Sequence, residues 1–292
     1  MRYFSDDRKR IIITDIGKVN LEHIFDNGQC FRWNKTETGN YIGVANEKVL
    51  ELSETENEIV IENISMDDFE KYFIKYFDFN VDYSAIIKNI ENLDKYIYEA
   101  TRFGYGLRML NQEPFETLIS FIVSANNNIP RIKNTIEKIS IKYGRFIMDY
   151  KGKSYYSFPS PYELSKATKE ELRELGLGYR DRYLMDTTKK VIEEGIDFQK
   201  FKELSTEEAK RKLIEFKGVG NKVSQCVLLF SIEKYDVFPI DTWVKKILGY
   251  FYKDEVKKYN SPETFLKNHF GVNAGYAQQY LFYYAREQKI GG

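Results

Sequence analysis

The sequence predicts an α+β fold, with a small N-terminal antiparallel β-sheet and its helices packed on a larger all-helical part. Short β-favouring runs with partial apolar–polar alternation fill the segment from Arg10 to Glu62. After Ser65, nearly every segment carries apolar residues at three- and four-residue spacing, which is the period of a helix. No long Pro/Gly/Ser linker separates the two parts, so we expect them to pack together.

The expected strands are joined by short hairpin-type connections, which favours an antiparallel sheet. They are the runs IIITDI (11–16), CFRW (30–33), NYIGVA (40–45), KVLELS (48–53) and EIVIENI (58–64). The intervening stretches NKTETG, NE and ETEN are polar and suit turns. Ser65, with Asp68 three residues later, resembles a capping box and predicts the start of a helix.

The rest of the chain is expected to be helical. The predicted helices are 83–100, 114–125, 130–144, 168–176, 181–195, 205–216, 221–232, 241–252 and 274–288. A chain of 292 residues is long for one compact domain and comfortable for two. We therefore predict an N-terminal sheet-and-helix domain over 1–100 and a helical domain over 101–292.

Composition excludes several classes of site. Lysine plus arginine equals aspartate plus glutamate at 44 each, so the protein does not rely on a global positive field, although one face can still be basic. Two cysteines, Cys30 and Cys226, rule out a disulfide framework and a four-cysteine zinc or iron–sulfur site. His23 and His269 stand in no metal-binding spacing. We predict no redox cofactor and no catalytic metal.

The N-terminal segment is charged, and its apolar run is too short for a signal peptide. No apolar stretch of about 18 residues follows, so a membrane span is not expected. We expect a cytoplasmic protein, associated with the nucleoid if the organism is prokaryotic, that acts as a monomer.

The stretch EFKGVGNKVSQC (215–226) places a glycine turn between two amphipathic helical segments. Gly218 and Gly220 enclose one apolar residue, and the earlier stretch LRELGLGYR (172–180) repeats the arrangement. Either turn alone suits an ordinary helix C-cap, because glycine favours the left-handed conformation there. Helices on both sides predict a helix–hairpin–helix over 206–231, in which turn N–H groups and the positive end of the second helix meet a phosphate.

Spacing excludes two other phosphate-binding loops. The turn lacks the G-x-x-x-x-G-K-[ST] spacing of a Walker A loop, and Val223 stands where a dinucleotide fingerprint needs glycine. Binding to nucleic-acid phosphates, which is independent of base sequence, remains. Lys222 opens the second helix with Cys226 one turn later on the same face. Taken alone, Lys222 suits a solvent-facing lysine and Asp241 suits a helix N-cap.

Five blocks along the chain extend this pattern. They are NGQCFRW (27–33), ISFIVSANNNIPRI (119–132), LGLGYRDRY (175–183), KGVGNKVSQC (217–226) and AGYAQQYLF (274–282). In their order and content they resemble the 8-oxoguanine DNA glycosylase family of the helix–hairpin–helix superfamily. The hairpin lysine, followed by the apolar-Pro-apolar-Asp run VFPID, resembles members that also cleave the strand. The resemblance implies a bifunctional DNA glycosylase/AP lyase of base excision repair that binds double-stranded DNA containing 8-oxoguanine.

The resemblance assigns catalysis to Lys222 and Asp241. An amine that attacks C1′ of the sugar forms a Schiff base, which opens a route to strand scission by β-elimination. The lysine must be unprotonated when it attacks. Asp241 would place a carboxylate near the positive charge that develops on the sugar.

By the same resemblance, the damaged base lies between Phe282 and Cys226, with its Watson–Crick edge on Gln278 and its N7–H on the backbone carbonyl of Gly28. Guanine has an acceptor at N7 whereas 8-oxoguanine has a donor, so an acceptor at that place discriminates between them. Gln278 and Phe282 are four residues apart and share a helix face. From the residues alone, Gly28 suits a turn, Phe282 a core aromatic and Gln278 a surface position.

The resemblance also assigns residues to the gap that the extruded base leaves. Asn126 would fill the gap, Tyr179 would wedge the stack, and Arg131 and Arg180 would read the orphaned cytosine. Other interpretations stay open, because the asparagine run suits a cap before Pro130 and both arginines suit phosphate contacts. With both arginines present, we expect a preference for cytosine opposite the lesion.

The chain departs from the family two residues after Asp241. Many members have a histidine there that contacts a DNA phosphate, whereas this chain has Trp243, which donates a hydrogen bond but carries no charge. Two alternatives to the expected activity are kept: a helix–hairpin–helix glycosylase for another damaged base, and a helix–hairpin–helix module that binds DNA without catalysis.

Overall fold

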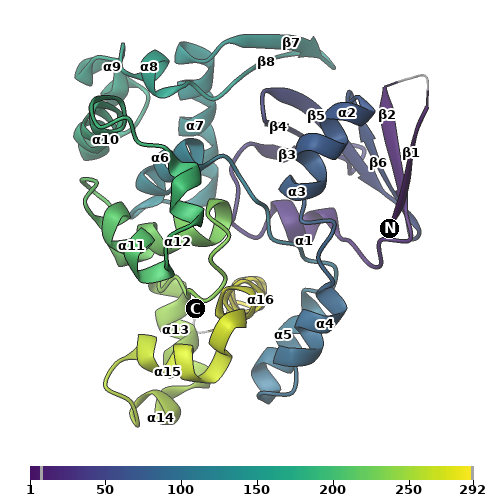
Figure 1. Cartoon of the computed structure of the whole chain (residues 1–292), viewed down its shortest axis with the longest axis vertical. Helices are drawn as coiled ribbons and strands as arrows, with labels where there is room; N and C mark the ends of the chain where they lie inside the picture. The colour runs from purple at the N-terminus through teal and green to yellow at the C-terminus, as the bar shows by residue number, and fades with distance from the viewer. Residues whose placement is uncertain (7–8, 291–292) are drawn as a thin grey trace.

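The N-terminal part of the protein is an antiparallel sheet and the remainder is mostly helical, so the predicted α+β class is confirmed (Figure 1). The computed structural model describes residues 1–6 and 9–290. Its strands are β1 (Arg2–Asp6), β2 (Arg10–Thr14), β3 (Trp33–Lys35), β4 (Tyr41–Ala45), β5 (Lys48–Glu54), β6 (Glu58–Glu62), β7 (Phe146–Tyr150) and β8 (Lys153–Tyr156). Across the two described ranges, no helix combines the length and apolarity needed to cross a membrane.

Six strands form the main sheet in the order β1-β2-β6-β5-β4-β3, and each neighbouring pair is antiparallel. Register places Ile12 opposite Val60 and Leu52 opposite Ile61. Two predictions about the sheet were wrong. The sheet begins with β1 and not at Arg10. The sequence did not reveal β1, because it is a largely exposed edge strand without apolar alternation. The strand expected at 30–33 starts only at its last residue.

The sheet packs on short helices to form one hydrophobic core. These helices are α1 (Leu21–Phe25), α2 (Met66–Asp68), the π-helical turn η1 (Phe69–Phe73) and α3 (Ile74–Tyr76). Trp33 is fully buried in this core, where its indole N–H donates to Tyr76 Oη at 2.9 Å. The predicted helix start is confirmed, because Ser65 Oγ accepts from the backbone N–H of Asp68 at 3.1 Å.

A second core is built from the helices that follow. They are α4 (Tyr83–Ile90), α5 (Lys95–Phe103), α6 (Pro114–Ser124), α7 (Ile129–Tyr143), α8 (Pro161–Leu164), α9 (Lys169–Glu174), η2 (Gly178–Arg180), α10 (Asp181–Glu193), η3 (Phe198–Lys202), α11 (Thr206–Ile214), α12 (Asn221–Ser231), α13 (Thr242–Phe251), α14 (Lys253–Val256), α15 (Pro262–Phe270), η4 (Gly271–Asn273) and α16 (Ala274–Glu287). Helices α6 and α12 pack against each other and contribute most of their apolar side chains to this core.

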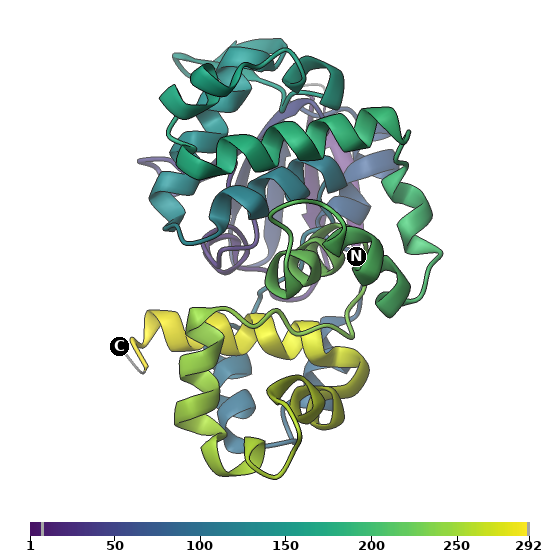
Figure 2. The same ribbon diagram turned by 90° about the vertical axis from the view of Figure 1, so that its left-hand side faces the viewer.

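Helices α4 and α5 pack with the C-terminal helices rather than with the sheet. Ile90 and Ile97 belong to the same apolar core as α13 and α16, and α5 lies along α16. Figure 2 shows these blue helices with the yellow-green α13–α16 as a lower group, below the group that contains the α11–α12 hairpin. The domain boundary between residues 100 and 101 stays a prediction, although the apolar core of the helical part reaches back to α4.

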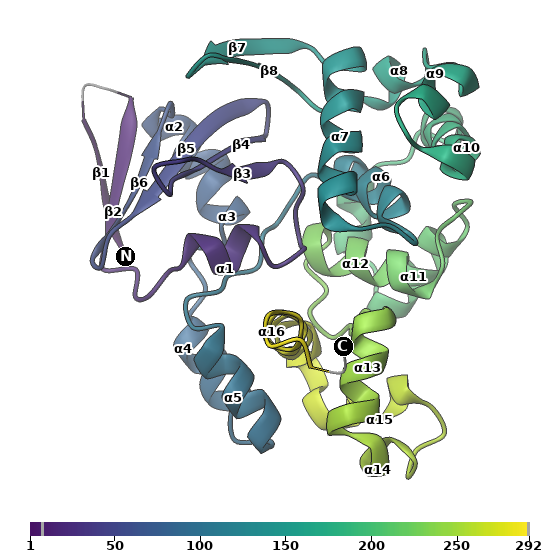
Figure 3. The ribbon, with the colours of Figure 1, turned by 180° about the vertical axis from the view of Figure 1, so that it is seen from behind.

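The hairpin β7–β8 is an exception to the expectation that nearly every segment after Ser65 is helical, and the sequence did not predict it. It follows α7 and lies over the sheet, as Figure 3 shows from behind. Ile147 and Met148 on β7 pack on a small apolar patch of Ile42, Val44 and Val49 on the sheet. The hairpin thus covers an apolar patch that lies far away in the sequence, so the local pattern did not reveal it.

Candidate active site

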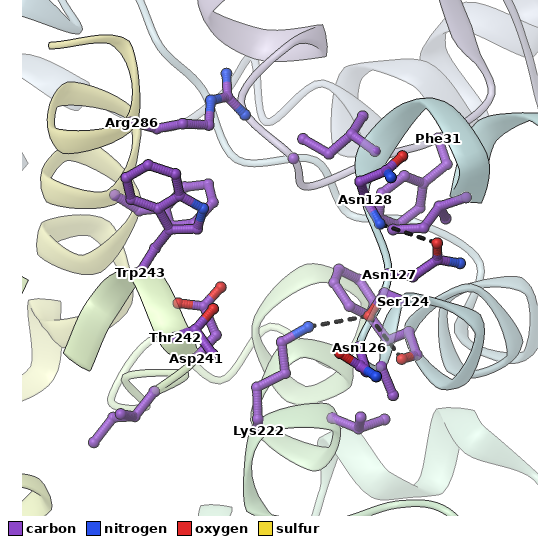
Figure 4. A pocket seen from close by; sticks show the side chains of 18 of the residues that line it. Phe31, Ser124, Asn126, Asn127, Asn128, Lys222, Asp241, Thr242, Trp243 and Arg286 are labelled. Atoms are coloured by element: carbon purple, nitrogen blue, oxygen red, sulfur yellow. Dashed lines mark hydrogen bonds between the residues drawn. The ribbon is translucent and has the colours of Figure 1, made fainter. Parts of the chain in front are cut away.

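A cavity of about 770 Å³ lies where the two groups of helices meet the sheet domain. Six segments line it: the turn after α1, the end of α6 with the following loop, the start of α7, the α11–α12 hairpin, the start of α13 and the second half of α16. Figure 4 shows side chains from these segments pointing toward one open space. The segments are far apart in sequence, so the cavity exists only in the folded chain.

The glycine hairpin has the geometry that its sequence predicted. Gly218 has a φ of +83°, and a β-carbon there would lie 2.6 Å from ring atoms of Tyr183. Gly220 is the extended N-cap of α12, with open space where a β-carbon would be. Within residues 9–290, no side chain caps the first turn of α12. The N–H groups of that turn therefore remain available to an anion.

Lys222 lies in the first turn of α12 and is half-buried in the cavity wall. Its Nζ donates to Ser124 Oγ at 3.1 Å and lies 4.9 Å from the centre of the Phe121 ring. Both contacts come from α6, which packs along α12. The lysine expected from the hairpin pattern thus enters the cavity instead of extending into bulk solvent (Figure 4).

Asp241 faces the same cavity from the start of α13. One carboxylate oxygen accepts from the backbone N–H of Val244 at 2.8 Å, so the N-cap role predicted from sequence is confirmed. The cap fixes the side chain at the helix start while the second oxygen remains beside the cavity. Lys222 and Asp241 thereby bring an amine and a carboxylate to opposite walls of one space.

Of the four predicted base-binding residues, Gly28 and Phe282 line the cavity. Gly28 has a φ of +85°, and a β-carbon there would lie 3.4 Å from Phe282 Cε1. Cys226 and Gln278 are buried one helical turn from lining residues and do not line the cavity themselves. Burial raises the pKa of the Cys226 thiol to about 11, although the charge of nearby Lys222 acts in the opposite direction. The Oε1 atom of Gln278 is buried without a hydrogen-bond partner among the described residues.

The predicted opposite-base residues divide into exposed and buried members. Asn126 lines the cavity with a φ of +50°, a conformation that asparagine tolerates better than most residues. Tyr179 and Arg131 are exposed, whereas Arg180 is only 5% exposed. The alternative interpretation of the asparagine run is confirmed for Asn128, whose Oδ1 accepts from the N–H of Arg131 at 3.0 Å to cap α7.

The two arginines tie the loop after α6 to the turn before α10, a role that sequence analysis missed. Arg180 donates from Nε to the Ala125 carbonyl and from Nη2 to the Asn126 carbonyl, each at 3.0 Å. Arg131 Nη2 donates more weakly to the Gly176 carbonyl at 3.4 Å. These bonds hold the Asn126 loop beside Tyr179 and so fix one edge of the cavity.

Sequence analysis also missed Arg286 and Lys245 as lining residues. Arg286 follows Phe282 by four residues, so the helical period contained this signal. Its guanidinium lies over the Phe282 ring and donates to the carbonyl of Asp26, two residues before Gly28. Together with Lys222, these cations outnumber Asp241, the one carboxylate among the described lining residues, so the cavity is basic in a chain of zero net charge.

Trp243 also lines the cavity, at the position where the sequence departs from the family pattern. The Nζ of Lys246 lies over the Trp243 ring, 4.7 Å from its centre. Figure 4 shows the indole between Arg286 and Asp241. Across residues 1–6 and 9–290, no group of three or more His, Cys, Asp or Glu side chains is placed to hold a metal ion.

Sequence profiles and solved structures relate this geometry to known proteins. Residues 11–118 match the 8-oxoguanine DNA glycosylase N-terminal domain, and residues 119–268 match the helix–hairpin–helix superfamily of base excision DNA repair proteins. The N-glycosylase/DNA lyase of Saccharomyces cerevisiae is 31% identical over an alignment of 267 residues, and the match covers 83% of this chain and 71% of the yeast protein. The chain belongs to the 8-oxoguanine DNA glycosylase family.

Solved structures of the family have the same architecture over the whole chain. The 8-oxoguanine glycosylase/lyase of Clostridium acetobutylicum, in complex with double-stranded DNA containing cytosine opposite 8-oxoguanine, is 41% identical with a TM-score of 0.93, covering 99% of both chains. A 3-methyladenine DNA glycosylase of Archaeoglobus fulgidus shares the fold at 22% identity, with a TM-score of 0.75 and coverage of 96% and 99%. The fold alone therefore does not select the damaged base.

Proposed function

We propose that this protein is a bifunctional DNA glycosylase/AP lyase that excises 8-oxoguanine from double-stranded DNA in base excision repair. The observation that carries the proposal is the juxtaposition of Lys222 and Asp241 across one cavity beside a glycine hairpin. The hairpin offers backbone N–H groups to a phosphate, and the cavity offers an amine to the sugar of an extruded nucleotide. Family membership supports the same assignment.

In the first step, the lone pair of Lys222 Nζ forms a bond to C1′ while the C1′–N9 bond breaks. The electron pair of that bond leaves with the base, which gains a proton. The nitrogen then loses a proton, and the sugar ring opens as O4′ leaves C1′ and is protonated. The product is a Schiff base between C1′ and Nζ, from which loss of a C2′ proton expels the 3′ phosphate.

Asp241 acts on the charge that develops at the sugar. Cleavage of the C1′–N9 bond leaves positive character on C1′ and O4′, and a fixed carboxylate stabilises it without having to reorganise during the reaction. The N-cap bond to Val244 supports this role, because it holds the carboxylate in place.

Selection of the base rests on Gly28, Phe282, Cys226 and Gln278. The carbonyl of Gly28 accepts from N7–H of 8-oxoguanine and repels the N7 lone pair of guanine. The ring of Phe282 offers a weakly polar face to the base from the cavity wall, and the neutral thiol of Cys226, buried one helical turn from Lys222, offers the other face once side chains of the wall move aside for the base. Gln278 supports the reading of the Watson–Crick edge, since its buried Oε1 lacks a partner and can accept from the base N–H groups.

We infer a preference for cytosine opposite the lesion from the loop that carries Asn126. Exposed Tyr179 and Arg131 lie beside it, and both can reach into an opened duplex. Arg180 reads the cytosine edge by exchanging one backbone acceptor for the base, at little net cost in hydrogen bonds. The basic lining makes DNA affinity fall as salt rises.

Borohydride trapping tests the proposal. Duplexes with 8-oxoguanine opposite each of the four bases are incubated with the protein and sodium borohydride, which reduces a Schiff base to a stable adduct. We expect a covalent adduct, fastest opposite cytosine. The variant Lys222→Gln abolishes it, whereas Lys245→Gln, which removes a cation from the same cavity, retains it.

Other results would contradict the proposal in distinguishable ways. Trapping only with oxidised pyrimidines or alkylated purines indicates a glycosylase for another lesion. DNA binding without an adduct on any lesion indicates a non-catalytic helix–hairpin–helix module. An adduct that survives in Lys222→Gln shows that another amine is the nucleophile.

A further inference from the structure

Ser124, the last residue of α6, makes the hydrogen bond that holds Lys222 in the cavity. Its hydroxyl donates to the Phe121 carbonyl at 2.7 Å, so its single proton is already engaged. Only the lone pairs of Ser124 Oγ remain for the lysine, whose Nζ lies 3.1 Å away. We propose that Ser124 is a positioning residue that orients the attacking amine of Lys222.

The direction of the hydrogen bonds carries this inference. A neutral amine has two N–H donors and one lone pair, and the lone pair attacks the sugar. When one N–H donates to Ser124, the lone pair has to point away from Oγ. The Phe121 ring, 4.9 Å from Nζ, occupies a second side. The Cys226 thiol also interacts with the lysine from one turn along α12, and the side that stays open faces the cavity and Asp241, where the sugar has to lie (Figure 4).

The position of Ser124 is itself fixed from two directions. On one side, α6 packs along α12, which carries Lys222. On the other side, the next two carbonyls, of Ala125 and Asn126, are held by the buried guanidinium of Arg180. Because Ser124 Oγ is held in place, its hydrogen bond restricts the long side chain of Lys222, which has four rotatable bonds, before DNA binds. Restriction of this kind raises the fraction of time in which the nitrogen lies in line with its target.

The experiment measures adduct formation and DNA binding separately, and the inference rests on the proposed function. Under single-turnover conditions with saturating 8-oxoguanine·cytosine duplex, we expect Ser124→Ala to lower the trapping rate about tenfold, the effect of one lost hydrogen bond. The Kd for the duplex changes less than twofold, since Ser124 orients the amine rather than the DNA. Ser124→Thr restores the rate to within about threefold, because threonine in a helix keeps a hydroxyl bonded one turn back.

Ser231→Ala is the matched control. Ser231 is likewise the last residue of its helix, α12, and its hydroxyl donates to the Val227 carbonyl at 2.7 Å, away from the cavity. We expect this variant to trap at the rate of the unmodified protein. If Ser124→Ala unfolds, Ser124→Cys replaces it, because a thiol of similar size is a weak acceptor and gives the same loss of rate.

Two outcomes overturn the inference. The first is a trapping rate in Ser124→Ala, or in Ser124→Cys, that equals that of the unmodified protein or of Ser231→Ala. The second is a fall in the trapping rate of Ser124→Ala that is not restored in Ser124→Thr, or that is accompanied by an equal weakening of DNA binding. Either result indicates a general structural role for Ser124. Failure of the proposed function differs from these, since the unmodified protein itself then gives no adduct.

Discussion

Replacing Gly218 by alanine should damage the hairpin, whereas the same change at Gly220 should not. The two glycines are two residues apart in one turn, so the pair controls for local sequence and exposure. Gly218 has a φ of +83°, and a β-carbon would lie 2.6 Å from Cγ and Cδ2 of Tyr183 and 3.1 Å from its Cβ. Gly220 has a φ of −99° and nothing within 4 Å of the same position.

The magnitude follows from two contributions. An L-residue in the left-handed region costs about 1–2 kcal/mol relative to the right-handed one. Overpacking against Tyr183 adds about 1–3 kcal/mol, because the close atoms include the Cβ and not just a flexible end. The expected loss for Gly218→Ala is therefore about 2–5 kcal/mol. For Gly220→Ala we expect less than about 1 kcal/mol, since alanine is merely a poorer N-cap than glycine.

Thermal unfolding followed by circular dichroism measures the difference. In a chain of this size, 1 kcal/mol corresponds to a shift in Tm of about 2 °C, so Gly218→Ala should melt about 4–10 °C lower. Gly220→Ala should melt within about 2 °C of the unmodified protein. Equal shifts for the two variants would refute the reasoning, because they would show that neither the backbone conformation nor the contact with Tyr183 determines the loss.

Two further predictions concern carboxylates at helix N-termini. Asp241→Asn should retain stability, because its side-chain oxygen still accepts from the N–H of Val244, but it should lose trapping activity. Asp241→Ala should lose trapping activity and also about 1 kcal/mol of stability, because the cap is gone. Melting and trapping assays on both variants measure the two effects. Burial alone would raise the pKa of the Asp94 carboxyl, but the hydrogen bond from His269 at 2.7 Å and the bonds from the helix N-cap hold this pKa below its usual value. Asp94 therefore stabilises the fold above its unfolded pKa of about 3.9, and this contribution disappears as the pH falls through the lower folded value. Chemical denaturation should show that Asp94→Asn loses less stability, relative to the unmodified protein, at pH 3 than at pH 7. Equal losses at the two pH values would contradict the assignment.

The hairpin and the helix starts were predictable because their signals are local. The φ of Gly218, the N-caps of Ser65 and Asp241 and the helical period each depend on residues within one or two turns. The order of strands β3 to β6 follows from short connections for the same reason, whereas the pairing of β2 with β6 joins strands that are not consecutive in the chain. The β7–β8 hairpin was missed because its apolar side chains pack on a sheet patch about one hundred residues earlier.

The sequence by itself determined the fold class, the glycine hairpin and, through its five blocks, the family, because each is a matter of residue type and spacing along the chain. Only the tertiary structure decided what surrounds the lysine. The contact between Lys222 and Ser124 joins residues 98 positions apart, and Arg180 reaches 55 positions back to Ala125. Such contacts depend on how helices pack, and no local pattern encodes which side chain meets which across a cavity.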